Sequence, residues 1–159
     1  MPNILSTRID NRLIHGQVGM TWVNSIQANL VLVANDEVAN DIVQQNLMDM
    51  VLPEGVQSRY FTIEKTINVI HKASVSQKIF IVIKTPQDAL KLVEGGVPIK
   101  YINVGNMHFE KGKKQISSTV SLDDDDIETF KKLSQLGIEL DVRGVPSDQR
   151  KNLMSLLWN

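Results

Sequence analysis

The segment of residues 8–18 holds two arginines, an aspartate and a histidine within eight positions: RIDNRLIHGQV. A purely structural loop seldom needs this set of side chains. Imidazole is a nucleophile at neutral pH, and a phosphoryl group placed on it can be transferred again to a second acceptor. The segment therefore predicts phosphoryl transfer through His15.

The neighbours of His15 suit a phosphoryl group. The guanidinium of Arg8 or Arg12 can hold phosphate oxygens with two parallel hydrogen bonds, and a helix starting near Gly16 offers free N–H groups to an anion. Asp10 can fix the imidazole tautomer by accepting a hydrogen bond, or it can simply cap its own turn. The candidate residues are His15, Arg12 and Asp10 for catalysis and Arg8, Gly16 and Gln17 for phosphate binding.

Seven short runs rich in Ile and Val alternate with segments of helical period, which is typical of an α/β chain. The run at residues 78–83 is apolar after its lysine, as in a strand covered on both faces. Helix-containing crossovers favour parallel strands, so we predict one doubly wound α/β domain. The seven runs are residues 4–9, 30–34, 58–62, 78–83, 100–104, 115–120 and 138–142.

Apolar residues at helical spacing predict the helices between these strands. Val43, Leu47, Met50 and Val51 repeat at i, i+4, i+7 and i+8, and a second stripe lies within residues 89–93. We expect both stripes to face the sheet.

Folds of this kind bind ligands at the carboxyl ends of their parallel strands. The loops after the fifth and seventh runs are therefore expected to form the binding site together with the loop of His15. Asn106, His108 and Arg143 are therefore expected to line the site. His108 could act as a second acid–base group, and a solvated loop histidine is the alternative.

Other conspicuous residues favour structural roles. Trp22 falls on an apolar helix face, where core packing is expected, and His71 lies near the carboxyl end of a predicted helix, where the dipole stabilises an imidazole. Consecutive aspartates at 123–126 point in different directions at a helix start, so we interpret them as complementing the dipole and expect no metal.

The composition excludes several classes of function. The chain has no cysteine, which removes thiolate catalysis and Cys-based metal centres. Its 17 basic and 18 acidic residues give a net charge of -1 and no global basic field for nucleic acid. No nucleotide-binding glycine motif follows the first strand. No apolar run approaches the roughly 20 residues of a membrane span, and no signal peptide is evident, so we expect a cytoplasmic protein.

Residues 8–18 resemble the signature of the mannose-family IIB component of the bacterial sugar phosphotransferase system. The similarity extends to residues 98–108 and 140–146 with compatible spacing and covers essentially the whole chain. The resemblance implies a single domain over residues 1–159 with an open, twisted, mainly parallel seven-stranded sheet and helices on both faces.

The resemblance also implies a phosphocarrier. His15 would accept a phosphoryl group on its pros (Nδ1) nitrogen from the phosphohistidine of a IIA protein, and would donate it to a sugar imported by the membrane components IIC and IID. Arg12 would neutralise the phosphoryl charge, and no metal or organic cofactor is implied. Similarity within residues 103–108 favours galactosamine or N-acetylgalactosamine as the sugar.

Two other functions remain as alternatives. Histidine phosphatases also place a nucleophilic histidine before glycine near the end of strand one, but they resemble Arg-His-Gly there, whereas Ile14 precedes His15 in this chain. A non-catalytic domain would use Arg8, Arg12 and the helix start only to hold an anion, and it would keep its function after His15→Ala.

Overall fold

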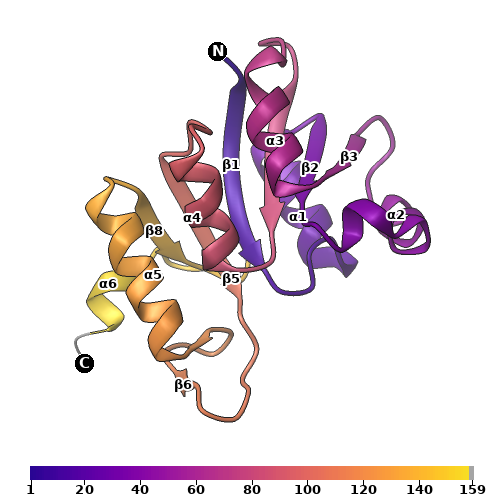
Figure 1. The fold of residues 1–159 in the computed structure, drawn as a ribbon. Coiled ribbons are helices and arrows are strands. Elements are labelled where there is room, and N and C mark those ends of the chain that lie inside the picture. Colours follow the sequence, from indigo (N-terminus) through magenta and orange to yellow (C-terminus); the bar gives the residue numbers. More distant parts are fainter. Residues whose placement is uncertain (158–159) are drawn as a thin grey trace.

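A computed structural model describes residues 1–157, except for the side chains of residues 17–19. Six parallel strands form one sheet (Figure 1). Their order across the sheet is β3-β2-β4-β1-β5-β8. The central strand β1 therefore lies between β4 and β5. The strands are β1 (Asn3–Asp10), β2 (Leu30–Ala34), β3 (Gln57–Phe61), β4 (Lys78–Ile83), β5 (Tyr101–Asn106) and β8 (Glu139–Val142).

The expected strand at residues 115–120 is wrong, so the sheet has six strands rather than seven. This part of the chain forms a small separate antiparallel pair, β6 (Lys114–Gln115) and β7 (Ser121–Leu122). Three hydroxyl residues lie between Ile116 and Val120, and the Ile116 N–H closes a turn by donating to the Val120 carbonyl at 2.9 Å. Such residues favour turns over a continuous strand.

Helices cover both faces of the sheet, as the sequence predicts. Helices α3, α4 and α5 pack on one face of the sheet, and helices α1 and α2 pack on the other. No helix in the described part of the chain is both long and apolar enough to span a membrane. The helices are α1 (Gly16–Ile26), α2 (Ile42–Asp49), α3 (Ile63–Val69), α4 (Pro86–Glu94), α5 (Asp124–Gln135) and α6 (Leu153–Leu156), with 3-10 turns η1 (Val38–Asn40) and η2 (Ile70–Lys72).

Strand β4 shows how the two layers share one sheet. Ile79, Ile81 and Ile83 pack in the core on the side of α4, whereas Phe80 and Val82 pack on the side of α1. All five side chains are at most 3% exposed. The prediction that this strand is covered on both faces is confirmed. In α4, Ala89 and Leu92 are also buried against the sheet, as expected.

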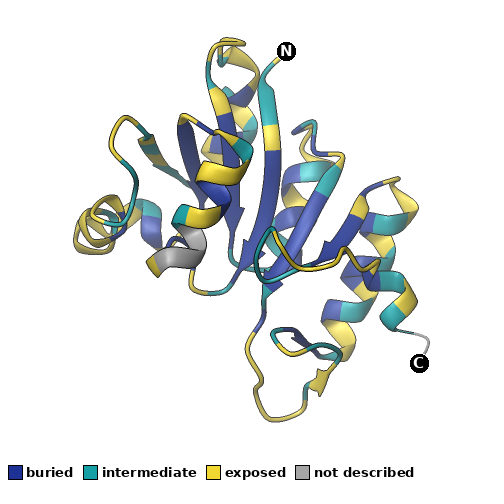
Figure 2. Ribbon diagram, turned by 180° about the vertical axis from the view of Figure 1, so that it is seen from behind, coloured by how far each residue is buried: buried dark blue, intermediate teal, exposed yellow. Residues whose placement is uncertain are grey.

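Three of the four residues in the stripe expected to bury α2 face solvent instead (Figure 2), whereas Val51 is partly buried against the core on the α1 side. Val43, Leu47 and Met50 are 65%, 59% and 82% exposed. Met48 is the buried residue of this helix, and one turn earlier the Gln45 amide donates to the carbonyl of Val38 in η1 at 2.7 Å. These two contacts set the rotation of α2 about its axis and turn most of the predicted stripe outward.

Candidate functional site

The loop of His15 crosses the carboxyl edge of the sheet between β1 and α1. The Leu13 N–H donates to the Asp10 carbonyl at 2.9 Å, which closes a tight turn. Leu13 and Gly16 have φ of 60° and 42°. Glycine adopts this conformation readily, whereas Leu13 is held there because its side chain is buried in the core beside Trp22. The core thus fixes the loop that carries His15.

The Asp10 carboxylate is buried and meets three groups of this region. Its Oδ2 lies 2.9 Å from His15 Nε2 and 3.2 Å from Arg8 Nη2, and its Oδ1 accepts from the Arg12 N–H at 3.0 Å. Because a carboxylate only accepts hydrogen bonds, this contact favours the tautomer with the proton on Nε2. In that tautomer, Nδ1 carries the free lone pair of the imidazole.

His15 lies directly before α1 and is partly accessible. It is the N-cap residue, with an extended backbone and no side-chain capping bond, and its side chain is 19% exposed. The positive end of the α1 dipole therefore lies beside the imidazole. An anion attached to the ring would be stabilised by this end of the helix.

Arg12 is accessible from solvent. Its side chain is 57% exposed, with Nε 3.9 Å from Asp10 Oδ1. Arg12 lines a cavity of about 370 Å³ together with Lys84, Glu37 and Asp41. The two cations could contact an anion, and the two carboxylates limit the net positive charge of the cavity.

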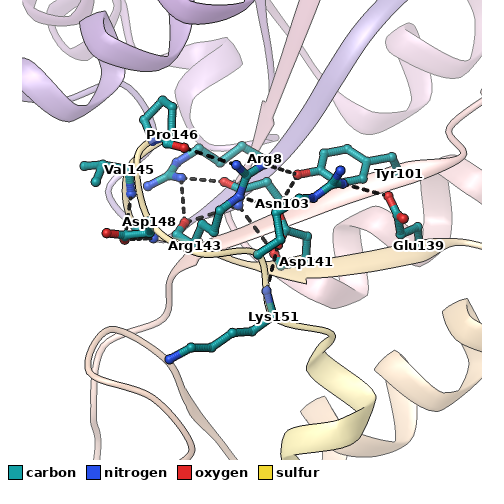
Figure 3. Close-up of polar contacts among 12 residues, drawn as sticks. Arg8, Tyr101, Asn103, Glu139, Asp141, Arg143, Val145, Pro146, Asp148 and Lys151 are labelled. Atoms are coloured by element: carbon teal, nitrogen blue, oxygen red, sulfur yellow. Dashed lines mark hydrogen bonds and ion pairs between the residues drawn. The ribbon is translucent and has the colours of Figure 1, made fainter.

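Arg8 occupies the opposite environment (Figure 3). It is 3% exposed, and its guanidinium donates to Asp10, to the side-chain oxygen of Asn103 and to the Arg143 carbonyl. Burial lowers the pKa of the Arg8 guanidinium, and the Asp10 carboxylate opposes this shift. Arginine nevertheless stays protonated near neutral pH. This position does not fit the phosphate-binding role expected of Arg8; it fits a residue that holds Asp10.

Sequence reasoning does not single out two residues of β5 that surround Arg8. Asn103 binds the guanidinium, and a Cβ atom at Gly105 would overlap it. Both lie on the polar side of a strand whose other side is formed by Ile102 and Val104. This alternation is the signal in the sequence that could have found them.

Trp22 is a buried core residue, as expected, and it also contacts the site from the α1 side. Its ring centroid lies 5.3 Å from Arg8 Cζ and 5.2 Å from Arg143 Cζ. The indole N–H donates to the Gly144 carbonyl at 2.9 Å. Trp22 therefore connects the helix that follows His15 to the loop after β8.

Arg143 is bound by neighbouring groups, and it also lines a cavity of about 260 Å³ together with Thr119 and Asp148. Its guanidinium donates to Asp141 at 2.7 Å, to the Tyr101 hydroxyl at 3.1 Å and to the Pro146 carbonyl at 3.2 Å. Burial alone would lower the pKa of Arg143, but its bonds to Tyr101 and Asp141 outweigh burial and raise it. The residue is thus a fixed cation of the β8 loop.

The remaining candidates have different positions. Asn106 donates to the Asn11 side chain at 2.6 Å and so ties the His15 loop to β5. His108 lies on the loop after β5, where its Nε2 is 3.0 Å from the Glu110 carboxylate and both side chains are exposed. The side chain of Gln17 lies outside the described residues.

The aspartate run begins α5. Asp123 and Asp126 form a capping box, in which each side chain accepts a hydrogen bond from the other residue's backbone N–H. Within residues 1–157, less the undescribed side chains, no group of three or more acidic or histidine residues could hold a metal ion. The capping geometry agrees with the dipole interpretation.

The comparisons with known proteins place the whole chain in one family. The family model described as PTS system sorbose subfamily IIB component matches residues 4–159. The N-acetylgalactosamine-specific phosphotransferase enzyme IIB component 2 of Escherichia coli (strain K12) is 58% identical over 157 residues, which cover 99% of this chain and 100% of that protein. The mannose-specific EIIAB component of the same organism is 42% identical over 94% of this chain and 47% of its own length.

A solved structure gives the same result for the fold. The crystal structure of the N-acetylgalactosamine-specific IIB component 1 from Escherichia coli superimposes with a TM-score of 0.92 at 55% identity, covering 95% of this chain and 99% of that one. The resemblance of residues 8–18 is confirmed at the level of the family. The chain belongs to the sorbose-subfamily IIB components of the sugar phosphotransferase system.

Proposed function

We propose that the protein is a phosphocarrier whose His15 accepts a phosphoryl group from a IIA phosphohistidine and donates it to a sugar imported by IIC and IID. The observation that carries the proposal is the 2.9 Å contact between Asp10 Oδ2 and His15 Nε2, which favours a free lone pair on Nδ1. Membership of the IIB family supports a transferase role in sugar transport.

In the first step, Nδ1 attacks the phosphorus atom of the donor. The new Nδ1–P bond forms as the donor N–P bond breaks, and the donor imidazole leaves with the electron pair. His15 keeps its Nε2 proton, so its ring gains positive charge, which the ionised Asp10 stabilises. Such transfers depend on positioning and charge stabilisation, which Arg12 and the start of α1 provide.

In the second step, a sugar hydroxyl attacks the phosphorus atom. The Nδ1–P bond breaks, the neutral imidazole of His15 is restored, and the hydroxyl proton passes to solvent. No metal or organic cofactor enters either step. The membrane components hold the sugar, so the protein would work at the cytoplasmic face of the membrane.

The names of the relatives support the choice of partners. The mannose-specific relative is named as an EIIAB component, which supports a IIA protein as the phosphoryl donor. The relative at 58% identity is named as specific for N-acetylgalactosamine. We therefore propose N-acetylgalactosamine as the sugar.

The test is intact-mass measurement after incubation with phosphoenolpyruvate, the two general phosphotransferase proteins and a mannose-family IIA protein. The wild type should gain one acid-labile phosphoryl group, and His15→Ala should gain none. His71→Ala is the matched control and should be labelled like the wild type. If an active IIA protein does not label the wild type, the proposal is wrong and the anion-binding alternative is favoured.

A further inference from the structure

We infer that Arg8 is a positioning residue that keeps His15 neutral and reactive by pairing with the buried carboxylate of Asp10. The inference rests on the proposed function, because it concerns the nucleophile of that reaction. It begins from one oxygen atom: Asp10 Oδ2 contacts both Arg8 Nη2 at 3.2 Å and His15 Nε2 at 2.9 Å. The guanidinium and the imidazole thus compete for the same negative charge.

The burial of Asp10 makes this competition matter. The side chain of Asp10 is 1% exposed, so water does little to neutralise its carboxylate. An uncompensated buried charge is unfavourable, and a nearby carboxylate favours the protonated form of an imidazole. Without Arg8, the pair of Asp10 and His15 would therefore draw a proton onto Nδ1. A doubly protonated imidazole has no lone pair with which to attack phosphorus.

Arg8 is held in place from several sides. Asn103 accepts from Nη1 through its side-chain oxygen and donates through its amide nitrogen to the Arg143 carbonyl at 3.2 Å, so both ends of the amide are used. Gly105 leaves the space that the guanidinium fills. The Trp22 ring lies 5.3 Å from Arg8 Cζ.

The other charged groups nearby do not replace Arg8 in this role. The backbone N–H of Arg12 binds Asp10, while its guanidinium is 57% exposed and 3.9 Å away at Nε. The guanidinium of Arg143 is directed to Asp141 and Tyr101. Arg8 is thus the buried cation in direct contact with Asp10.

The test compares the pH dependence of phosphoryl transfer from phosphorylated IIA protein to wild type and Arg8→Met. The pH midpoint of His15 protonation is followed in parallel by nitrogen NMR of the imidazole. In Arg8→Met we expect the midpoint to rise by about one pH unit, with transfer at pH 7 slower by about threefold and recovered at higher pH. A merely structural role would slow transfer equally at every pH.

Three further variants make the result specific. Arg8→Lys keeps the positive charge and should restore most of the midpoint, although the single ammonium cannot make both sets of bonds. Arg8→Gln tests the same point with a neutral polar side chain if Arg8→Met does not fold, and it should show the same upward shift. Arg59→Met removes an exposed arginine of β3 and should leave the midpoint unchanged.

The outcomes separate this inference from the proposed function. If the wild type accepts no phosphoryl group, the proposed function fails. If the wild type is labelled but the folded neutral variants of Arg8 keep its midpoint and its transfer rate at pH 7, the positioning role of Arg8 is wrong. The same conclusion follows if Arg8→Lys and Arg8→Met shift the midpoint equally.

Discussion

The outer face of α2 and the surroundings of Arg8 reverse the usual distribution of side chains. On α2, Val43 and Leu47 are 65% and 59% exposed, although both are apolar. At the carboxyl end of the central strand β1, Arg8 and Asp10 are 3% and 0% exposed, although both are charged. Burial here follows from the available partners. The two charges bind each other and neighbouring polar groups, whereas Met48 is the buried residue that anchors α2 in the core.

The largest loss of stability should come from Gly105→Ala, which disturbs the surroundings of Arg8. The added Cβ would overlap the buried guanidinium of Arg8, which could move away only by breaking its bonds to Asp10, Asn103 and the Arg143 carbonyl. We expect a loss of about 3 kcal/mol in the free energy of unfolding, measured with urea, together with a large loss of phosphoryl acceptance. Gly144→Ala is the matched control, because its Cβ would make ordinary contacts at 3.4 Å or more. Equal stability of the two variants would contradict the close packing of Arg8.

Asn103→Ala should have the next largest effect. It removes the acceptor for Arg8 and the donor to the Arg143 carbonyl, so buried polar groups lose their partners. We expect the free energy of unfolding to fall by about 2 kcal/mol, measured by urea denaturation at pH 7. A fall below about 0.5 kcal/mol would show that water enters the region around Arg8 and replaces the amide.

Two tyrosines with raised pKa values predict that the free energy of unfolding depends on pH in the alkaline range. Burial and the hydrogen bond to Asp141 raise the pKa of Tyr101, and burial and Asp49 raise that of Tyr60. Both pKa values are higher in the folded state than in the unfolded chain, where a tyrosine has a pKa of about 10. The contribution of these tyrosines to the free energy of unfolding is therefore fully present below about pH 10 and is lost as the pH rises above it. We expect Tyr101→Phe to lower stability by about 1 kcal/mol at pH 7 and to make this alkaline loss shallower. An equally steep loss in the variant would exclude Tyr101 as its source.

The smallest effect should come from the outer face of α2. Leu47→Gln exchanges an exposed apolar side chain for another good helix former, so the free energy of unfolding should change by less than about 0.5 kcal/mol. Met48→Ala, at the neighbouring buried position, should lower it by at least about 2 kcal/mol. Thermal or urea unfolding of the two variants shows which residue of α2 is buried. A larger loss of stability in Leu47→Gln than in Met48→Ala would mean that the apolar stripe of α2 faces the sheet.

The sequence predicts the fold well wherever one short segment contains the signal. The apolar run of β4 is recognisable because both of its faces are buried, and the loop of His15 is recognisable because its chemical groups are close in sequence. The false strand at residues 115–120 shows the limit of this reasoning. Its β-branched residues predict a strand, but the three hydroxyl residues between Ile116 and Val120 form a turn.

The partners of Arg8 could not be predicted from local spacing. Asn103 and Arg143 lie 95 and 135 residues away along the chain, and only the strand order brings them beside β1. The sequence predicts a phosphate-binding role for Arg8 because arginines commonly bind phosphate. The structure instead pairs it with Asp10, a role that depends on tertiary contacts.

The identity of the phosphorylated atom is the decisive test of His15 as the phosphoryl acceptor. Phosphorus and nitrogen NMR of the ¹⁵N-labelled protein, after phosphorylation by a IIA protein, would assign the P–N bond to one imidazole nitrogen. We predict a single phosphoryl group on His15 Nδ1, with Nε2 protonated and facing Asp10. A phosphoryl group on Nε2 of His15, or on His108, would contradict it.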